Sequence, residues 1–332
     1  MAKVIIAIHG MRNKPPRLLL REWFIASMKE GIEKKQINLR LPRFKLVYWA
    51  DILYKKPLSP AEKNPESEYF IDEPYLPEGK SKIPSYFELR KKLSGIIKTI
   101  VYKVILDKSY HLRYPLLAKS YIHNNFRDLE IYFAENCEEN PGPDCESRRR
   151  INNRLIKVLK RHRKDDILLI AHSMGTIIAY DVLNFILKDI KIHTFVTMGS
   201  PLGAPFVVSR IAKYSKLINN SDIPLKTPET VIKNWYNFSD IRDYIALDYK
   251  LAEDFRENSH GVKVKDILVN NTYEINGTAN PHKSFGYLRT PEFISVLDEF
   301  VKSEPIYKKR IHVVKKKLVN LVDAIKRKRR NK

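Results

Sequence analysis

The sequence predicts an α/β protein whose core is a doubly wound, mostly parallel sheet. Short apolar runs rich in β-branched residues alternate with longer segments of helical apolar spacing, which is the pattern of parallel strands joined by crossover helices. With 332 residues, 43% of them apolar, the chain can bury a large core. One apolar run leads through residues 171–175 directly into a helical segment. Together these observations predict one elaborated domain that carries an insertion.

The N-terminal part of the chain predicts a βαβ unit. Residues 3–8 form a short β-branched run, and residues 44–49 form a second one. Residues 17–35 lie between them and have the apolar spacing of a crossover helix. The apolar side chains available for its core face are Leu19, Trp23, Ile25 and Ile32. We therefore expect the two strands to pair in parallel.

The alternation breaks after the second strand. Prolines and charged residues dominate residues 54–84, and no strand is convincing there, so this segment is interpreted as an insertion. Residues 86–108 follow with an apolar stripe at helical spacing among lysines. Such a helix packs on its own core or acts as a lid that exposes the stripe to lipid, and the pattern leaves both open.

The rest of the chain returns to alternating elements. The segments expected are helices over 128–133, 147–163, 174–187 and 291–301, and strands over 166–170, 193–198, 233–238 and 265–269. The chain then divides into a first part of the core over 1–53, an inserted helical cap or lid over 54–125, the remainder of the core over 126–305 and a basic C-terminal tail over 306–332.

Ser173 lies at the turn between an expected strand and an expected helix. This is the setting of a nucleophile elbow, which exposes a serine hydroxyl at the carboxyl end of a strand. The strained turn tolerates only small residues two before and two after the serine, and Ala171 and Gly175 meet that condition. Because the usual pattern has glycine at both positions, the flanking strand and helix carry most of this prediction.

A serine nucleophile needs a general base that a carboxylate orients, and on this fold the order along the chain is serine, acid, histidine. His282 lies between the last expected strand and the last expected helix, where the base belongs. Two carboxylates, Asp240 and Asp243, follow the strand at 233–238, and either one can reach the base. The sequence therefore predicts a Ser-His-Asp triad with two candidates for the acid.

Two backbone N–H groups must face the oxyanion that forms during acyl transfer. One is expected from Met174, the residue after the nucleophile. The other is expected from the loop after the first strand, where Gly10 lets the backbone turn inward and Met11 supplies the N–H. His9 is interpreted as a residue that shapes this loop, because His282 already fills the base position.

The chain resembles the serine hydrolases of the α/β-hydrolase superfamily, in the lipase and esterase branch that includes glycosylphosphatidylinositol-deacylase-like proteins. The matching segments are residues 8–11, 47–51, 171–175, 198–202, 237–243 and 282–288. The resemblance implies an α/β-hydrolase fold and an ester or thioester hydrolase that works through an acyl-enzyme, without metal or cofactor. The spacing Asp-x-aliphatic-Ala in the acid loop of related hydrolases favours Asp243, and Asp240 then holds the loop through backbone hydrogen bonds.

The charge of the chain is strongly basic and uneven. Of the formal net charge of +23, residues 307–332 contribute twelve Lys or Arg against one acid, and residues 148–164 hold nine basic residues and no acid. Apolar residues recur at helical spacing in the tail, which suits an amphipathic helix on an anionic membrane and equally a solvated terminal helix. Nucleic acid ranks last, because no nucleic-acid module is recognised and aromatics do not interleave with the basic run.

Two further features bear on where the chain works. The apolar run at residues 4–8 is too short for a signal-peptide core or a membrane span, so we expect a cytoplasmic protein that can sit peripherally on the inner face of the membrane. Cys137 and Cys145 are too few to hold a structural zinc ion. A reducing cytosol favours free thiols, whereas a thermophile permits a disulfide between them.

Two classes of function follow. The first is a serine hydrolase that cleaves acyl esters, with a lipid-like substrate, the insertion as a lid and the basic surface at a membrane. The second is a catalytically silent protein of the same fold that binds an anionic membrane or a partner through its basic segments. A serine, an acid and a histidine at the expected places favour the first class.

Overall fold

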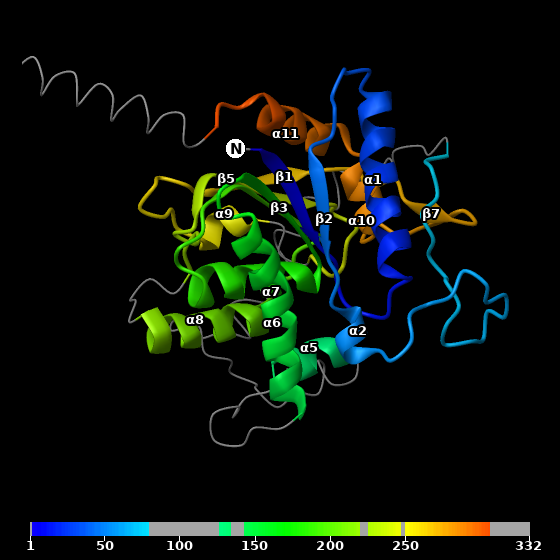
Figure 1. The fold of residues 1–332 in the computed structure, drawn as a ribbon, viewed down its shortest axis with the longest axis horizontal. Helices are drawn as coiled ribbons and strands as arrows, with labels where there is room; N and C mark the ends of the chain where they lie inside the picture. Colours follow the sequence, from blue (N-terminus) through cyan, green and yellow to red (C-terminus); the bar gives the residue numbers. More distant parts are fainter. Residues whose placement is uncertain (1, 80–125, 134–142, 220–224, 247–249, 306–332) are drawn as a thin grey trace, which may run out of the picture.

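The computed structural model describes residues 2–79, 126–133, 143–219, 225–246 and 250–305 (Figure 1). The expected helix at 86–108, the basic tail and Cys137 lie outside the described residues. None of the helices in the described ranges is both long and apolar enough to cross a membrane.

Six parallel strands form the central sheet, in the order β2-β1-β3-β4-β5-β6. The strands are β1 (Lys3–Ile8), β2 (Arg43–Val47), β3 (Asp166–His172), β4 (Ile192–Met198), β5 (Val231–Ser239) and β6 (Val264–Leu268). The predicted fold class is confirmed, because this wound parallel sheet is that of an α/β-hydrolase-like fold. β3 runs two residues further than expected, so that His172 is its last residue and Ser173 follows the strand directly.

Helices cover both faces of the sheet (Figure 1). One face carries α5 (Arg127–Tyr132), α6 (Pro143–Arg161), α7 (Met174–Asp181), the π-helical η1 (Val182–Ile186), α8 (Pro205–Asn219) and α9 (Leu251–Asp254). The other carries α1 (Arg17–Lys34), α10 (Ser284–Leu288) and α11 (Pro291–Lys302). Along β1, alternate residues enter the two cores, which is why the strand reads as one unbroken apolar run.

The expected core face of α1 is mostly wrong. The buried apolar side chains are Leu20, Phe24, Met28 and Ile32, one on every turn of the helix. Leu19, Trp23 and Ile25 are only partly buried, and Trp23 and Ile25 pack on the edge of the core instead. The face is therefore rotated about the helix axis from the expected one and only Ile32 belongs to both sets.

Several elements were not expected from the sequence. One is the helix α8, of 15 residues. The others are short: α2 (Ala50–Leu53), α9, α10 and a small hairpin of β7 (Glu274–Ile275) and β8 (Thr278–Ala279). The single helix expected over 174–187 is α7 followed by η1. In the described part of the insertion, residues 54–79, the chain has neither helix nor strand.

The segment 54–79 nevertheless packs on the core. The phenol of Tyr75 donates to Glu30 of α1 at 2.9 Å, and the phenol of Tyr273 donates to the carbonyl of Pro74 at 2.6 Å. At its start, the backbone N–H of Leu58 donates to the carbonyl of Lys14 in the loop after β1, at 2.9 Å. The insertion therefore also reaches the carboxyl edge of the sheet, the edge at which ligands bind in such folds.

Candidate active site

Ser173 occupies a strained turn between β3 and α7. Its φ is 53°, in the left-handed region that favours glycine, and its side chain is buried. The turn packs tightly against the loop after β1: a Cβ on Gly175 would lie 2.7 Å from the carbonyl oxygen of His9, and one on Gly10 would lie 2.7 Å from the Cβ of Ser173. Close packing thus explains why glycine occurs at positions 10 and 175 beside this serine.

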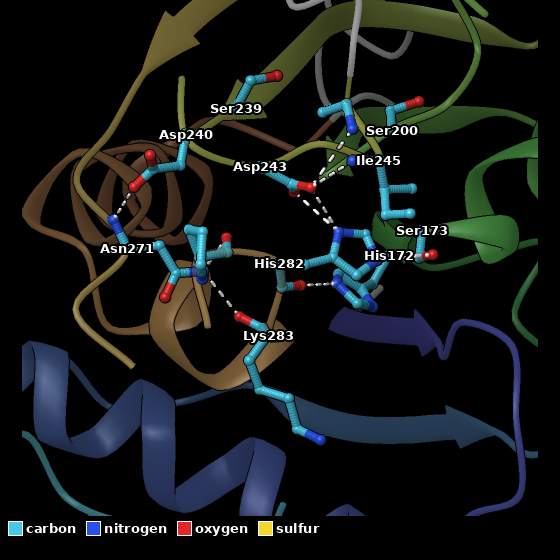
Figure 2. A network of polar contacts seen from close by, with 12 residues as sticks. His172, Ser173, Ser200, Ser239, Asp240, Asp243, Ile245, Asn271, His282 and Lys283 are labelled. Carbon is cyan, nitrogen blue, oxygen red and sulfur yellow. Dashed lines mark hydrogen bonds and ion pairs between the residues drawn. The ribbon is translucent and has the colours of Figure 1, made fainter. Parts of the chain in front are cut away.

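Three side chains from distant parts of the chain form one hydrogen-bonded series. Ser173 Oγ lies 2.9 Å from His282 Nε2, and His282 Nδ1 lies 2.8 Å from Asp243 Oδ2 (Figure 2). Ser173 follows β3, Asp243 lies in the loop after β5, and His282 lies between the β7–β8 hairpin and α10. The structure therefore brings together the serine, the histidine and one of the two acids expected from the sequence.

The Asp243 carboxylate is buried and accepts several hydrogen bonds besides that of His282. The phenol of Tyr287 donates to Oδ2 at 2.8 Å, and the backbone N–H of Ile245 donates to Oδ1 at 2.9 Å. Burial and the charge of Asp243 raise the pKa of Tyr287 well above its usual value, so the phenol keeps the proton that it donates. These donors fix the position of the carboxylate that faces His282 Nδ1.

Asp240 has different partners. Its buried carboxylate pairs with the Arg242 guanidinium at 2.6 Å and accepts the backbone N–H groups of Arg242 at 2.8 Å and Asn271 at 2.7 Å. These contacts fix the acid loop and tie it to the loop after β6. Asp240 thus makes the backbone contacts that its alternative, supporting role requires.

His9 is buried in the loop after β1 and is held by Trp49. The backbone N–H of Trp49 donates to His9 Nε2 at 3.0 Å, the indole N–H donates to the His9 carbonyl at 3.0 Å, and the two rings stack. Burial lowers the pKa of His9 to about 3, so the ring stays neutral. His9 therefore shapes the loop that leads to Gly10 and Met11.

The backbone N–H groups expected to bind an oxyanion are both available. Within the described ranges, neither Met11 N–H nor Met174 N–H has a hydrogen-bond partner. Arg12, next to Met11, has a left-handed φ of 70°, and its N–H donates to Asp128 at 2.6 Å. The chain direction at this loop is therefore fixed while the Met11 N–H is left free.

A cavity of about 310 Å³ opens beside Ser173 and His282. The loop after β1, the segment 71–73 and residues next to His282 line it, so the insertion contributes to its wall. Lys14 also lines it, and its ammonium donates to the carbonyl of Met11. Burial, with the nearby charge of Lys283, lowers the pKa of Lys14 to about 7.

A smaller apolar recess of about 30 Å³ lies beside Met11 and Met174. Its further lining side chains are Phe126, Leu129, Ile177, Pro201, Ala204, Phe206, Tyr244 and Ile245. Among the described residues, no group of three or more His, Cys, Asp or Glu is placed to hold a metal ion.

Three residues at this site were not assigned a role from the sequence. Tyr287 bonds to Asp243, His172 contacts the loop of His282, and Asn271 contacts both that loop and Asp240. His172 and Tyr287 lie in two segments that the sequence analysis connects with the site, the elbow at 171–175 and the segment 282–288. Asn271 has no such signal, because its role depends on backbone groups that fold onto it.

Comparison with known families gives one match in the middle of the chain. The model of the lecithin:cholesterol acyltransferase family matches residues 151–225. The matched range runs from α6 through β3, α7 and β4 past α8, and it includes Ser173 but neither Asp243 nor His282. A comparison with curated protein sequences finds no match.

Proposed function

We propose that this protein is a serine hydrolase of carboxylic esters, in which Ser173 is the nucleophile, His282 the general base and Asp243 the acid that orients it. The observation that carries the proposal is the hydrogen-bonded series from Ser173 through His282 to Asp243, at 2.9 Å and 2.8 Å. Serine becomes a strong nucleophile only with a base in such reach. The series also opens on a cavity, as a substrate requires.

The first half of the reaction forms an acyl-enzyme. Ser173 Oγ attacks the ester carbonyl carbon while His282 Nε2 takes the hydroxyl proton, and Asp243 stabilises the imidazolium. The carbonyl oxygen becomes an oxyanion that the N–H groups of Met11 and Met174 bind. Collapse of this intermediate breaks the bond to the alcohol, which leaves with the proton from His282.

The second half releases the acyl group. Water enters the cavity, His282 takes one of its protons, and the resulting attack on the acyl carbon releases the carboxylic acid and regenerates Ser173. An alcohol in place of water would yield a new ester by the same steps. The name of the matched family, which is an acyltransferase of lipids, supports both a lipid-like substrate and this second outcome.

The decisive experiment is covalent labelling of Ser173 with a fluorophosphonate, together with turnover of a graded panel of acyl esters and phospholipids. Wild-type protein should label and cleave at least one ester, and Ser173→Ala should do neither. Analysis of products in the presence of an alcohol separates hydrolysis from transfer. Folded wild-type protein that neither labels nor cleaves any ester would refute the hydrolase and support the alternative, a catalytically silent protein that binds membrane or a partner.

We also propose that the insertion at 54–125 forms a cap over the site and that the basic tail at 306–332 binds anionic membrane. The net charge of +23 and its concentration in the tail support this, because anionic lipid attracts clustered lysine and arginine. Removal of the chain from Tyr307 onward should weaken binding to vesicles that contain phosphatidylserine, without changing turnover of a small soluble ester. Equal vesicle binding with and without the tail would refute this role.

A further inference from the structure

We propose that Asn271 and His172 are positioning residues that hold the imidazole of His282 in reach of both Ser173 and Asp243, by fixing the three backbone carbonyls of residues 281–283. The inference rests on the proposed function, since it concerns the geometry of the same base. Neither side chain touches the reacting atoms. Both act through the backbone that carries His282.

Asn271 holds the two carbonyls on either side of His282. Its side chain is fully buried, and Nδ2 donates to the carbonyl of Pro281 at 2.8 Å and to that of Lys283 at 2.8 Å (Figure 2). Oδ1 accepts the backbone N–H of Tyr273 at 3.1 Å. Because one end of the amide faces two acceptors and the other faces a donor, the amide has one favourable orientation.

His172 holds the remaining carbonyl. Its Nε2 donates to the carbonyl oxygen of His282 at 2.6 Å, and the two imidazole rings lie 4.9 Å apart (Figure 2). Burial and the neighbouring His282 lower the pKa of His172 well below its usual range. The ring therefore stays neutral and does not repel the imidazolium that forms on His282 during the reaction.

The same residues connect the base to the acid loop. The backbone N–H of Asn271 donates to Asp240, whose own N–H donates to the Tyr287 phenol at 2.9 Å, and that phenol donates to Asp243. Asn271 also packs against Gly286, where a Cβ would lie 1.6 Å from Oδ1. The loops that carry His282 and Asp243 therefore share one buried frame with Asn271 at its centre.

This frame matters because His282 must satisfy two partners at once. The segment 281–283 lies between a two-stranded hairpin and a short helix, neither of which fixes an imidazole on its own. A displacement of the base by about 1 Å can lower a catalysed rate by about 100-fold. The Asn271 amide and the His172 ring both donate to backbone carbonyls, so loss of either donor should lower kcat. Asn271 does not line the cavity beside Ser173, so its loss should leave KM unchanged.

The chain offers a matched control for Asn271. Asn258 is also buried, and its Nδ2 donates to two carbonyls, those of Pro228 at 3.0 Å and Val231 at 2.7 Å. These carbonyls lie at the amino end of β5, whereas Asp243 follows its carboxyl end. Asn271→Ala and Asn258→Ala each remove a side-chain amide that joins two backbone carbonyls. Both should lower the urea midpoint of unfolding, but only the first should lower kcat and the rate of fluorophosphonate labelling, by about 10- to 100-fold.

Variants of His172 provide an independent test, which remains if Asn271→Ala does not fold. His172→Phe keeps a ring without the donor and should lower kcat, whereas His172→Gln can still donate to the His282 carbonyl and should restore part of the loss. The proposal is overturned if His172→Phe has wild-type kcat, or if Asn271→Ala loses no more kcat than Asn258→Ala. Failure of the proposed function is distinct, because wild-type protein would then be inactive as well.

Discussion

The backbone of Gly199 packs against the imidazole of His282: a Cβ added at Gly199 would lie 3.0 Å from His282 Nδ1, and 2.8 Å from Asp243 Oδ2. Gly199 also has a φ of +53°, which an L side chain rarely adopts. Gly199→Ala should therefore separate the His282–Asp243 pair and lower kcat by more than about 10-fold. Ester turnover of the purified variant measures the loss of kcat, and thermal unfolding measures the loss of stability that the left-handed backbone causes.

Gly261 is the control for this substitution. It has a φ of +70°, but a Cβ there would meet nothing within 4 Å. Gly261→Ala should cost about 1 kcal/mol of stability, as for any alanine in a left-handed conformation, and leave kcat unchanged. Equal losses of kcat in the two variants would show that backbone strain, and not contact with His282, causes the effect.

Asp243→Asn and Asp240→Asn should fail in different ways. The first keeps the shape of the side chain but removes the charge that orients His282, so kcat should fall by about 10⁴-fold while the fold persists. The second removes the carboxylate that pairs with the buried Arg242 guanidinium at 2.6 Å and should mainly destabilise the fold, by about 3–5 kcal/mol. Kinetics and urea unfolding of both variants show which aspartate orients His282 and which stabilises the fold. A large loss of kcat in Asp240→Asn, with mainly a loss of stability in Asp243→Asn, would exchange the two assignments.

Acid should destabilise the protein through its buried histidines. Burial lowers the pKa of His9 to about 3 and of His193 to about 4, and holds that of His172 well below 6.5. Between the folded-state pKa of each ring and about pH 6.5, that ring binds a proton mainly in the unfolded state. The free energy of unfolding should therefore fall as pH falls below about 6.5, by up to about 1.4 kcal/mol per pH unit for each ring.

Urea unfolding at half-unit intervals from pH 7 to 4.5 measures this slope. His193 lies at the start of β4, far along the sheet from Ser173, and His193→Gln should reduce the slope by up to about 1.4 kcal/mol per pH unit. A slope that is the same in wild type and His193→Gln would contradict the assignment.

Lys14 should lower stability while it is charged. Its pKa in the folded state, about 7, lies below the usual lysine value of 10.5. At pH 7 and below, the folded protein therefore contains a buried charged ammonium, which in the unfolded chain is exposed to water. Between pH 7 and 10.5 the folded protein loses this proton first, and wild-type stability rises. Lys14→Met should therefore raise the melting temperature at pH 6, by an increment that shrinks toward pH 10.

Lys29→Met, at an exposed position on α1, controls for the loss of a positive charge. An increment for Lys14→Met that grows with pH would contradict this account. The Lys14 ammonium also donates to the Met11 carbonyl. Ester turnover on the same samples therefore shows whether this charge supports the loop that carries the Met11 N–H.

Much of the fold could be predicted from the sequence because parallel strands buried on two faces form unbroken apolar runs. The run at 166–170 and the helical segment after it were enough to locate the turn at Ser173, and the order of elements placed His282 after the last large strand. The structure brings these two side chains within 2.9 Å. Their catalytic roles stay predictions.

Other features could not be predicted because they depend on contacts between distant segments. Asn271 donates to carbonyls that come near it only when β6 and the hairpin have folded. The periodic pattern of apolar residues predicts helices and strands, but it does not predict a hydrogen bond between a side-chain amide and a distant backbone group. The buried face of α1 differs from the predicted one for a related reason. Four large apolar side chains suggested one stripe, whereas the sheet and α11 select another that also needs Gly31, where a Cβ would lie 2.8 Å from Ile294.

The long-range pairings beneath the site have a consequence for how activity is acquired. The strand β3, which precedes Ser173, pairs with β1, where Lys3 lies opposite Asp166. His282 in turn meets Ser173 from 109 residues further along the chain. Contacts between residues so far apart in sequence form slowly, because the closure of long loops is entropically costly. A refolding chain would therefore regain its helices before it regains a reactive serine, which makes Ser173 reactivity a reporter of the final folding event.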